Sequence, residues 1–84
     1  MPEISRFYGI AISIRFIGRE HNPPHFHAKY KNKMAAYTIR TMEKIEGKLP
    51  PTAEKLVKEW AKLHQEELLD IWEKQNFVKI EPLE

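Results

Sequence analysis

The sequence predicts an α+β fold: a small antiparallel β-sheet of three to five strands, with one long C-terminal helix packed on one face. Two observations lead to this prediction. Apolar and polar side chains alternate through much of residues 8–47, which is the period of half-buried strands. From residue 53 to residue 72, apolar side chains recur at helical spacing. Because sheet and helix each have one apolar surface, we expect them to pack together and leave the other sheet face open.

Alternation and turn residues delimit the expected strands. We expect strand segments at residues 8–17, 25–31, 34–41, 42–47 and 77–80. Residues 18–24 are expected to form a loop, because Asn22-Pro23-Pro24 favours extended or turn geometry. Residues 31–33 are expected to form a hairpin turn. Gly47 is expected to end the fourth segment.

The helix is expected to begin near Pro50, Pro51 and Thr52, because prolines are tolerated in a first helical turn. The apolar positions of its stripe include Ala53, Leu56, Val57, Trp60, Ala61, Leu68 and Trp72. No helix breaker interrupts this stripe before about Lys74, so we expect one long helix, with a kink allowed, rather than two. Both tryptophans keep the helical period and are therefore assigned to the core.

The composition limits the class of protein. The chain has 84 residues, which predicts one domain covering residues 1–84. It contains no cysteine, so disulfides and thiolate metal sites are excluded. No apolar run approaches the roughly 20 residues of a membrane span, and no apolar signal sequence is present, so a cytoplasmic protein is expected. The net charge is only +2, but residues 1–40 are basic, with only Glu3 and Glu20 acidic among them.

The open sheet face is expected to carry the functional groups. Its polar positions would be Ser13, Arg15, His25, His27, Lys29 and Arg40. His25 and His27 lie two apart on a strand and should project together. Imidazole titrates near neutrality, so these two could exchange protons with RNA in a metal-independent cleavage.

Cations near the two histidines would neutralise the phosphate group in such a cleavage. We therefore predict His25 and His27 as catalytic residues and expect no cofactor. The predicted substrate-binding residues are Arg6, Tyr8, Arg15, Lys29 and Arg40. Tyr8, Tyr30 or Phe26 could stack a base, although Tyr30 and Phe26 fit the core better.

Two other interpretations of the histidines remain open. His21, His25 and His27 form an H-x3-H-x-H pattern whose three nitrogen ligands would suit Zn²⁺, Cu²⁺ or Ni²⁺. Alternatively, the histidines hold the turn beside Pro23-Pro24 or recognise a partner protein, and the chain is a non-catalytic binding module. His64 lies on the helix stripe and is expected at the edge of the core.

Several motifs resemble one bacterial family along nearly the whole chain. They are Ile4–Ile10, the central His21-Asn-Pro-Pro-His-Phe-His-Ala28, Glu46–Pro50, Glu59–His64 with Trp72-Glu73, and Ile80–Leu83. In this order they resemble the domain of unknown function 4160 family. The motif positions that correspond are Arg6, Tyr8, His21, Asn22, His25, His27, Trp60, His64 and Trp72. Many relatives have an acidic residue where Thr38 stands here, which lowers the expectation of metal-dependent catalysis.

The resemblance implies a small bacterial protein whose gene commonly adjoins a second small gene, similar to a toxin–antitoxin pair. It therefore implies a toxin-like component with a cognate antitoxin-like partner. With the basic face, we expect a ribonuclease or RNA-binding protein that does not act at a membrane. Self-association as a homodimer is an alternative source of stability, because so short a chain buries little core.

Overall fold

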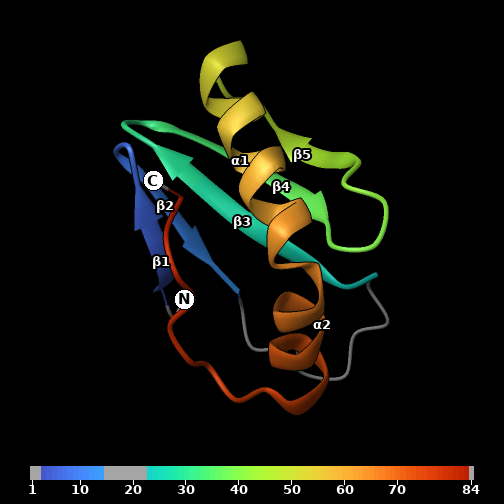
Figure 1. Cartoon of the computed structure of the whole chain (residues 1–84). Coiled ribbons are helices and arrows are strands. Elements are labelled where there is room, and N and C mark those ends of the chain that lie inside the picture. Colours follow the sequence, from blue (N-terminus) through green and yellow to red (C-terminus); the bar gives the residue numbers. More distant parts are fainter. Residues whose placement is uncertain (1–2, 15–22, 84) are drawn as a thin grey trace.

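The computed structural model describes residues 3–14 and 23–83, and Figure 1 shows their arrangement. The elements are β1 (Glu3–Phe7), β2 (Ile10–Ser13), β3 (His25–Tyr30), β4 (Lys33–Thr38), β5 (Lys44–Gly47), α1 (Pro51–Leu63) and α2 (Gln65–Lys74). The strands lie in the order β1-β2-β3-β4-β5, and each neighbouring pair is antiparallel. The predicted α+β class and antiparallel sheet are therefore confirmed.

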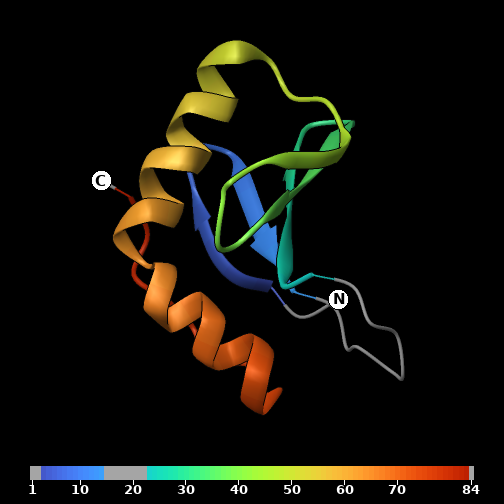
Figure 2. The ribbon, with the colours of Figure 1, turned by 90° about the vertical axis from the view of Figure 1, so that its right-hand side faces the viewer.

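Both helices lie on one side of the sheet and leave the other face without a helix (Figure 2). The sheet residues that face the helices are buried, as the alternation of Phe26 and Ala28 predicted. Trp60 of α1 is completely buried, and its ring centroid lies 5.4 Å from that of Phe7 and 6.2 Å from that of Phe26. Trp72 of α2 is also buried, so both tryptophans belong to the core as predicted.

The first predicted strand, residues 8–17, is wrong at its start. Tyr8 and Gly9 form the turn between β1 and β2, and β1 itself was not predicted. Both turn residues have positive φ, 49° and 78°, as a two-residue hairpin turn requires. An aromatic residue rarely adopts positive φ, so the alternation of residues 8–14 hid the turn. Residues 15–17 of the prediction lie outside the described residues.

The predicted single helix is also corrected, because the chain forms two helices with a break at His64. His64 has φ −117° and ψ 24°, which are not helical angles. Its backbone N–H donates the last hydrogen bond of α1 to the carbonyl of Trp60. Its carbonyl accepts the first hydrogen bond of α2 from the N–H of Leu68. The Gln65 amide donates to the carbonyl oxygens of Ile39 and Arg40 in the turn after β4, at 2.7 and 2.9 Å. This tertiary contact favours the break at a point where no residue of the sequence breaks a helix.

The last predicted strand, residues 77–80, does not form. This segment runs back beside β1 without regular structure (Figure 1). The Ile80 N–H donates to the Ile4 carbonyl at 2.7 Å, and the Trp60 indole N–H donates to the Glu81 carbonyl at 2.9 Å. Pro82 has no N–H with which to extend a strand pairing. The segment therefore covers the core through two bonds rather than as a sixth strand.

The predicted end of β5 at Gly47 is confirmed. Gly47 has φ 72°, and a Cβ atom there would overlap the carbonyl oxygen of Met34. The Lys48 N–H donates to the same oxygen at 3.0 Å. A side chain at residue 47 would therefore collide with backbone that is already held in place.

Candidate functional site on the open sheet face

The strand register defines which side chains lie on the helix-free face. Ser13 of β2 pairs with His27 of β3, and His27 pairs with Ala36 of β4. The next row on this face consists of Arg6, Ala11, Lys29 and Met34. Directly paired residues share a face of the sheet, so these two rows lie side by side on the open face.

A hollow of about 230 Å³ lies over these rows. Its lining residues are Glu3, Arg6, Ala11, Ser13, His27, Lys29 and Met34. Three of them, Arg6, His27 and Lys29, are predicted site residues, and they come from two different strands, β1 and β3. The fold thus brings together a guanidinium, an ammonium and an imidazole from segments that are separated by about 20 residues in the sequence.

Glu3 is a carboxylate of this hollow and pairs with Arg6. Arg6 Nη2 donates to Glu3 Oε1 at 2.8 Å, and Arg6 Nε donates to Glu3 Oε2 at 3.3 Å. The hydrogen bond from Arg6 is the main cause of a lowered pKa for the Glu3 carboxyl. A β-bulge between Glu3 and Ser5 adds one residue to β1, so two residues three apart share a face. The pair holds the guanidinium over the hollow.

His27 lies on the predicted face but is buried, which differs from the expectation of an exposed imidazole. His27 is 3% exposed, and both nitrogens of its ring are shielded from solvent. The ring lies between the small residues Ser13 and Ala36 and contacts the His25 ring edge-on, with centroids 5.2 Å apart. As the buried member of the lining, His27 forms the floor of the hollow.

His25, the first residue of β3, lies between the open face and helix α2. Its ring centroid is 5.0 Å from that of Trp72, so one side of the imidazole packs on the core. Its Nδ1 is 2.9 Å from the Pro23 carbonyl oxygen. A carbonyl only accepts, so Nδ1 carries the hydrogen and the lone pair of a neutral ring lies on Nε2.

Tyr8 and Arg40, two other predicted site residues that the structure describes, do not line this hollow. Tyr8 lines a different pocket on the helix side of the sheet. Arg40 is exposed in the turn after β4, where its carbonyl accepts a hydrogen bond from Gln65. Arg15 and His21 lie outside the described residues, as does Asn22.

The metal hypothesis rests partly on His21 and so extends beyond the residues that the structure describes. Within residues 3–14 and 23–83, no group of three or more histidines, aspartates and glutamates is placed to hold a metal ion. His25 and His27 alone are two nitrogen ligands, fewer than a zinc site uses. In the same ranges, neither helix has the length and apolar character needed to cross a membrane.

Two lining residues were missed by the sequence analysis. Glu3 was overlooked because β1 was not predicted. Its pairing with Arg6 also depends on a β-bulge, which no sequence pattern predicts. Met34 was assigned to the third strand without a role. It could have been found once the turn at residues 31–33 fixed the register, because Lys29 then pairs with Met34.

Comparison with known proteins identifies the family but no activity. The family model described as "Domain of unknown function (DUF4160)" matches residues 9–73, which is most of the chain. Comparisons with curated proteins and with solved structures gave no match. The matched segment includes β2 to β5 and nearly all of both helices. The chain is therefore a member of the DUF4160 family.

Proposed function

We propose that the open sheet face binds the phosphate groups of single-stranded RNA, and that this chain is the RNA-acting member of a two-gene, toxin–antitoxin-like pair. The observation that carries the proposal is the hollow that Arg6 and Lys29 both line. Arginine can bind a phosphate through two parallel hydrogen bonds, and lysine adds a compact positive charge. Such cations supply most of the affinity of proteins for nucleic acid backbones.

The spacing of the two cations fits this role. Arg6 and Lys29 pair with the same residue, Ala11, from opposite sides. Neighbouring strands are about 4.8 Å apart, so the backbones at these two positions are separated by roughly 10 Å. The Ala11 side chain is a single methyl group, which fills little of the space between them. Two long side chains can therefore converge on one phosphate or hold two successive phosphates of a strand.

The geometry supports binding more directly than cleavage. The His27 nitrogens are shielded from solvent, so in this conformation they do not reach a phosphate bound in the hollow. The floor that the ring provides would set the depth to which a ligand enters. A role for His27 in proton transfer would need a movement of the ring.

Cleavage of RNA is a second candidate function, favoured by the 5.2 Å contact of the His25 and His27 rings. With Nδ1 hydrogen-bonded to Pro23, His25 has Nε2 available as a base. The test is incubation of labelled RNA with the protein in EDTA. Cleavage that disappears in the double variant His25→Ala, His27→Ala supports the catalytic role. Cleavage that persists in that variant, or its absence in the wild-type protein, removes it.

The binding proposal is tested by fluorescence anisotropy with a labelled single-stranded RNA. The double variant Arg6→Ala, Lys29→Ala should bind about five- to tenfold more weakly than the wild-type protein. The matched control is Lys55→Ala, Lys62→Ala, which removes the same charge from exposed positions of α1. Equal affinity of the wild-type protein and the Arg6, Lys29 variant would contradict the proposal.

The alternative, a binding module for a cognate partner protein, predicts a different result on the same variants. Because the partner would cover the same face, copurification of the adjacent gene product would be lost in the Arg6, Lys29 variant. RNA binding by the isolated protein would then be weak and equal in all variants. Competition between RNA and the partner would instead show that one face serves both.

A further inference from the structure

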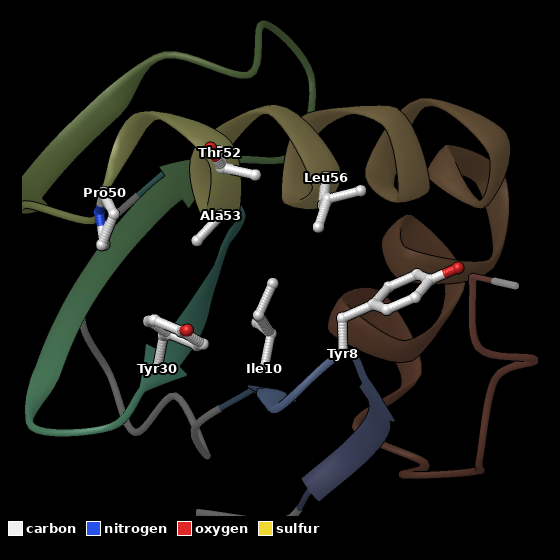
Figure 3. Close-up of a pocket in the computed structure, with 7 residues that line it drawn as sticks. All are labelled: Tyr8, Ile10, Tyr30, Pro50, Thr52, Ala53 and Leu56. Carbon is white, nitrogen blue, oxygen red and sulfur yellow. The ribbon is translucent and has the colours of Figure 1, made fainter.

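A second pocket lies on the helix side of the sheet, at the end that carries the β1–β2 and β3–β4 turns (Figures 1 and 3). Its volume is about 100 Å³, and its lining residues are Tyr8, Ile10, Tyr30, Pro50, Thr52, Ala53 and Leu56. Tyr8 and Tyr30 lie on either side of Ile10, below the first turns of α1 (Figure 3). None of the lining residues is acidic.

Tyr8 occupies an unfavourable position for an aromatic residue. It adopts φ 49° in the β1–β2 turn, where asparagine followed by glycine is the favoured pair. The side chain is not used by the core, because the residue is 58% exposed. A strained backbone at an exposed aromatic residue is typical of a functional position. The turn thus holds a phenol ring beside the pocket at a cost to the folded state.

We propose that this pocket binds one base of the RNA whose phosphates the open face contacts, an inference that rests on the proposed function. A cavity of about 150 Å³ can enclose benzene, so this pocket of about 100 Å³ takes only part of a base, whose remaining surface would stack against the exposed Tyr8 ring. Tyrosine rings stack bases of any identity because every base has a π-face. The Lys31 Nζ lies 5.3 Å from the Tyr30 ring centroid, which places a positive charge beside the pocket.

The charge distribution favours a nucleotide over an apolar side chain of a partner protein. The lining has no carboxylate to repel phosphate, and Lys31 and Lys33 lie at the adjacent turn. The pocket and the hollow lie on opposite faces of the sheet. Lys29 and Tyr30 are consecutive in β3 and belong to the two different sites. A strand of RNA would therefore have to pass around the turns at this end of the sheet to contact both sites.

The test uses adenosine and uridine, which have no phosphate, in an NMR titration of the whole protein. Either nucleoside should shift the resonances of Tyr8 and Tyr30 and saturate. The variant Tyr8→Asn, which relieves the strained turn and so should remain folded, should weaken this binding more than about tenfold. Nucleosides that leave Tyr8 and Tyr30 unshifted overturn the inference. So does a shift produced only by N-acetyl-leucine amide, which would identify a site for a protein side chain.

A second measurement separates this inference from the proposed function. The wild-type protein should bind RNA with one abasic position about tenfold more weakly than intact RNA. The Tyr8→Asn variant should bind the abasic and the intact RNA with equal affinity. If abasic and intact RNA bind the wild-type protein equally, the base pocket is wrong and phosphate binding stands. If nucleosides bind but RNA does not, the proposed function fails and the pocket remains a nucleobase site.

Discussion

At the scale of single residues, the Glu3 carboxylate has two opposite effects on the open face. The carboxylate orients the guanidinium but also places a negative charge in a hollow that would receive phosphate. A carboxyl of ordinary pKa is already ionised near neutral pH, and the lowered pKa of Glu3 extends its charge to more acidic conditions. The pair is exposed, so its contribution to the stability of the fold is small.

Replacing Glu3 by Gln should therefore strengthen RNA binding. The amide keeps the shape of the side chain but removes the repulsion and the competition for Arg6. We expect an affinity about two- to fivefold higher, with little change in the thermal midpoint, measured by anisotropy and by thermal denaturation. Weaker RNA binding by this variant would mean that Arg6 acts only when the carboxylate positions it.

Tyr8 gives a second prediction at the same scale. Its backbone conformation is unfavourable, and its exposed side chain adds little packing to offset that cost. Tyr8→Asn should raise the free energy of unfolding by about 1 kcal/mol, since asparagine tolerates positive φ. Urea denaturation of the two proteins measures this difference. A less stable variant would show that the exposed ring contributes more packing than its position suggests.

At the scale of elements, the sheet and α1 are joined by a hydrogen bond as well as by apolar packing. The Tyr37 hydroxyl of β4 donates to Glu54 Oε2 of α1 at 2.8 Å, and Lys44 Nζ of β5 lies 3.9 Å from the same oxygen. Burial and the hydrogen bond to Glu54 raise the pKa of Tyr37 well above its ordinary value. The hydroxyl therefore favours its protonated form in the folded state.

This bond predicts a pH-dependent effect of Tyr37→Phe. At neutral pH the variant should be about 1 kcal/mol less stable, because Glu54 loses a donor. The raised pKa of Tyr37 means that its contribution is intact below the unfolded value of about 10 and declines as pH rises beyond it. The difference between the two proteins should therefore shrink above about pH 10 in urea denaturation. A difference that stays constant from neutral pH to well above the unfolded pKa would contradict this assignment.

The elements also show which parts of the fold were predictable. Alternation in residues 25–31 and the turn at residues 31–33 were sufficient for β3, for the start of β4 and for the buried face. The predicted end of β4 at Thr41 was wrong, because the strand ends at Thr38 and residues 39–41 form a turn. The turn at Tyr8-Gly9 was missed because its backbone conformation contradicts the usual preference of tyrosine. The break at His64 was missed because Gln65 bonds to carbonyls about 25 residues away in the chain. Both errors come from tertiary structure overriding a local pattern.

At the scale of the whole molecule, the sheet has one face without a helix, as predicted. The predicted side chains differ in how far they are exposed on that face. Register could place Lys29 and His27 beside Ala11 and Ser13 once the strands were known. It could not show that the His27 ring is buried or that His25 packs on Trp72, because side-chain packing decides both. The bulge that brings Glu3 to Arg6 was equally beyond sequence patterns. On this face the cations of Arg6 and Lys29 are exposed, whereas the imidazole of His27 is buried.

The salt dependence of RNA binding tests phosphate recognition by this face most directly. For a single-stranded nucleic acid, the slope of log K against log salt changes by about 0.7 for each phosphate that the protein neutralises. The variant Arg6→Ala, Lys29→Ala should therefore have a slope smaller than that of the wild-type protein, by about 0.7 if the two side chains share one phosphate and by about 1.4 if they hold two, whereas Lys55→Ala, Lys62→Ala should keep the wild-type slope. Identical slopes in the wild-type protein and the Arg6, Lys29 variant would contradict phosphate binding on the open sheet face.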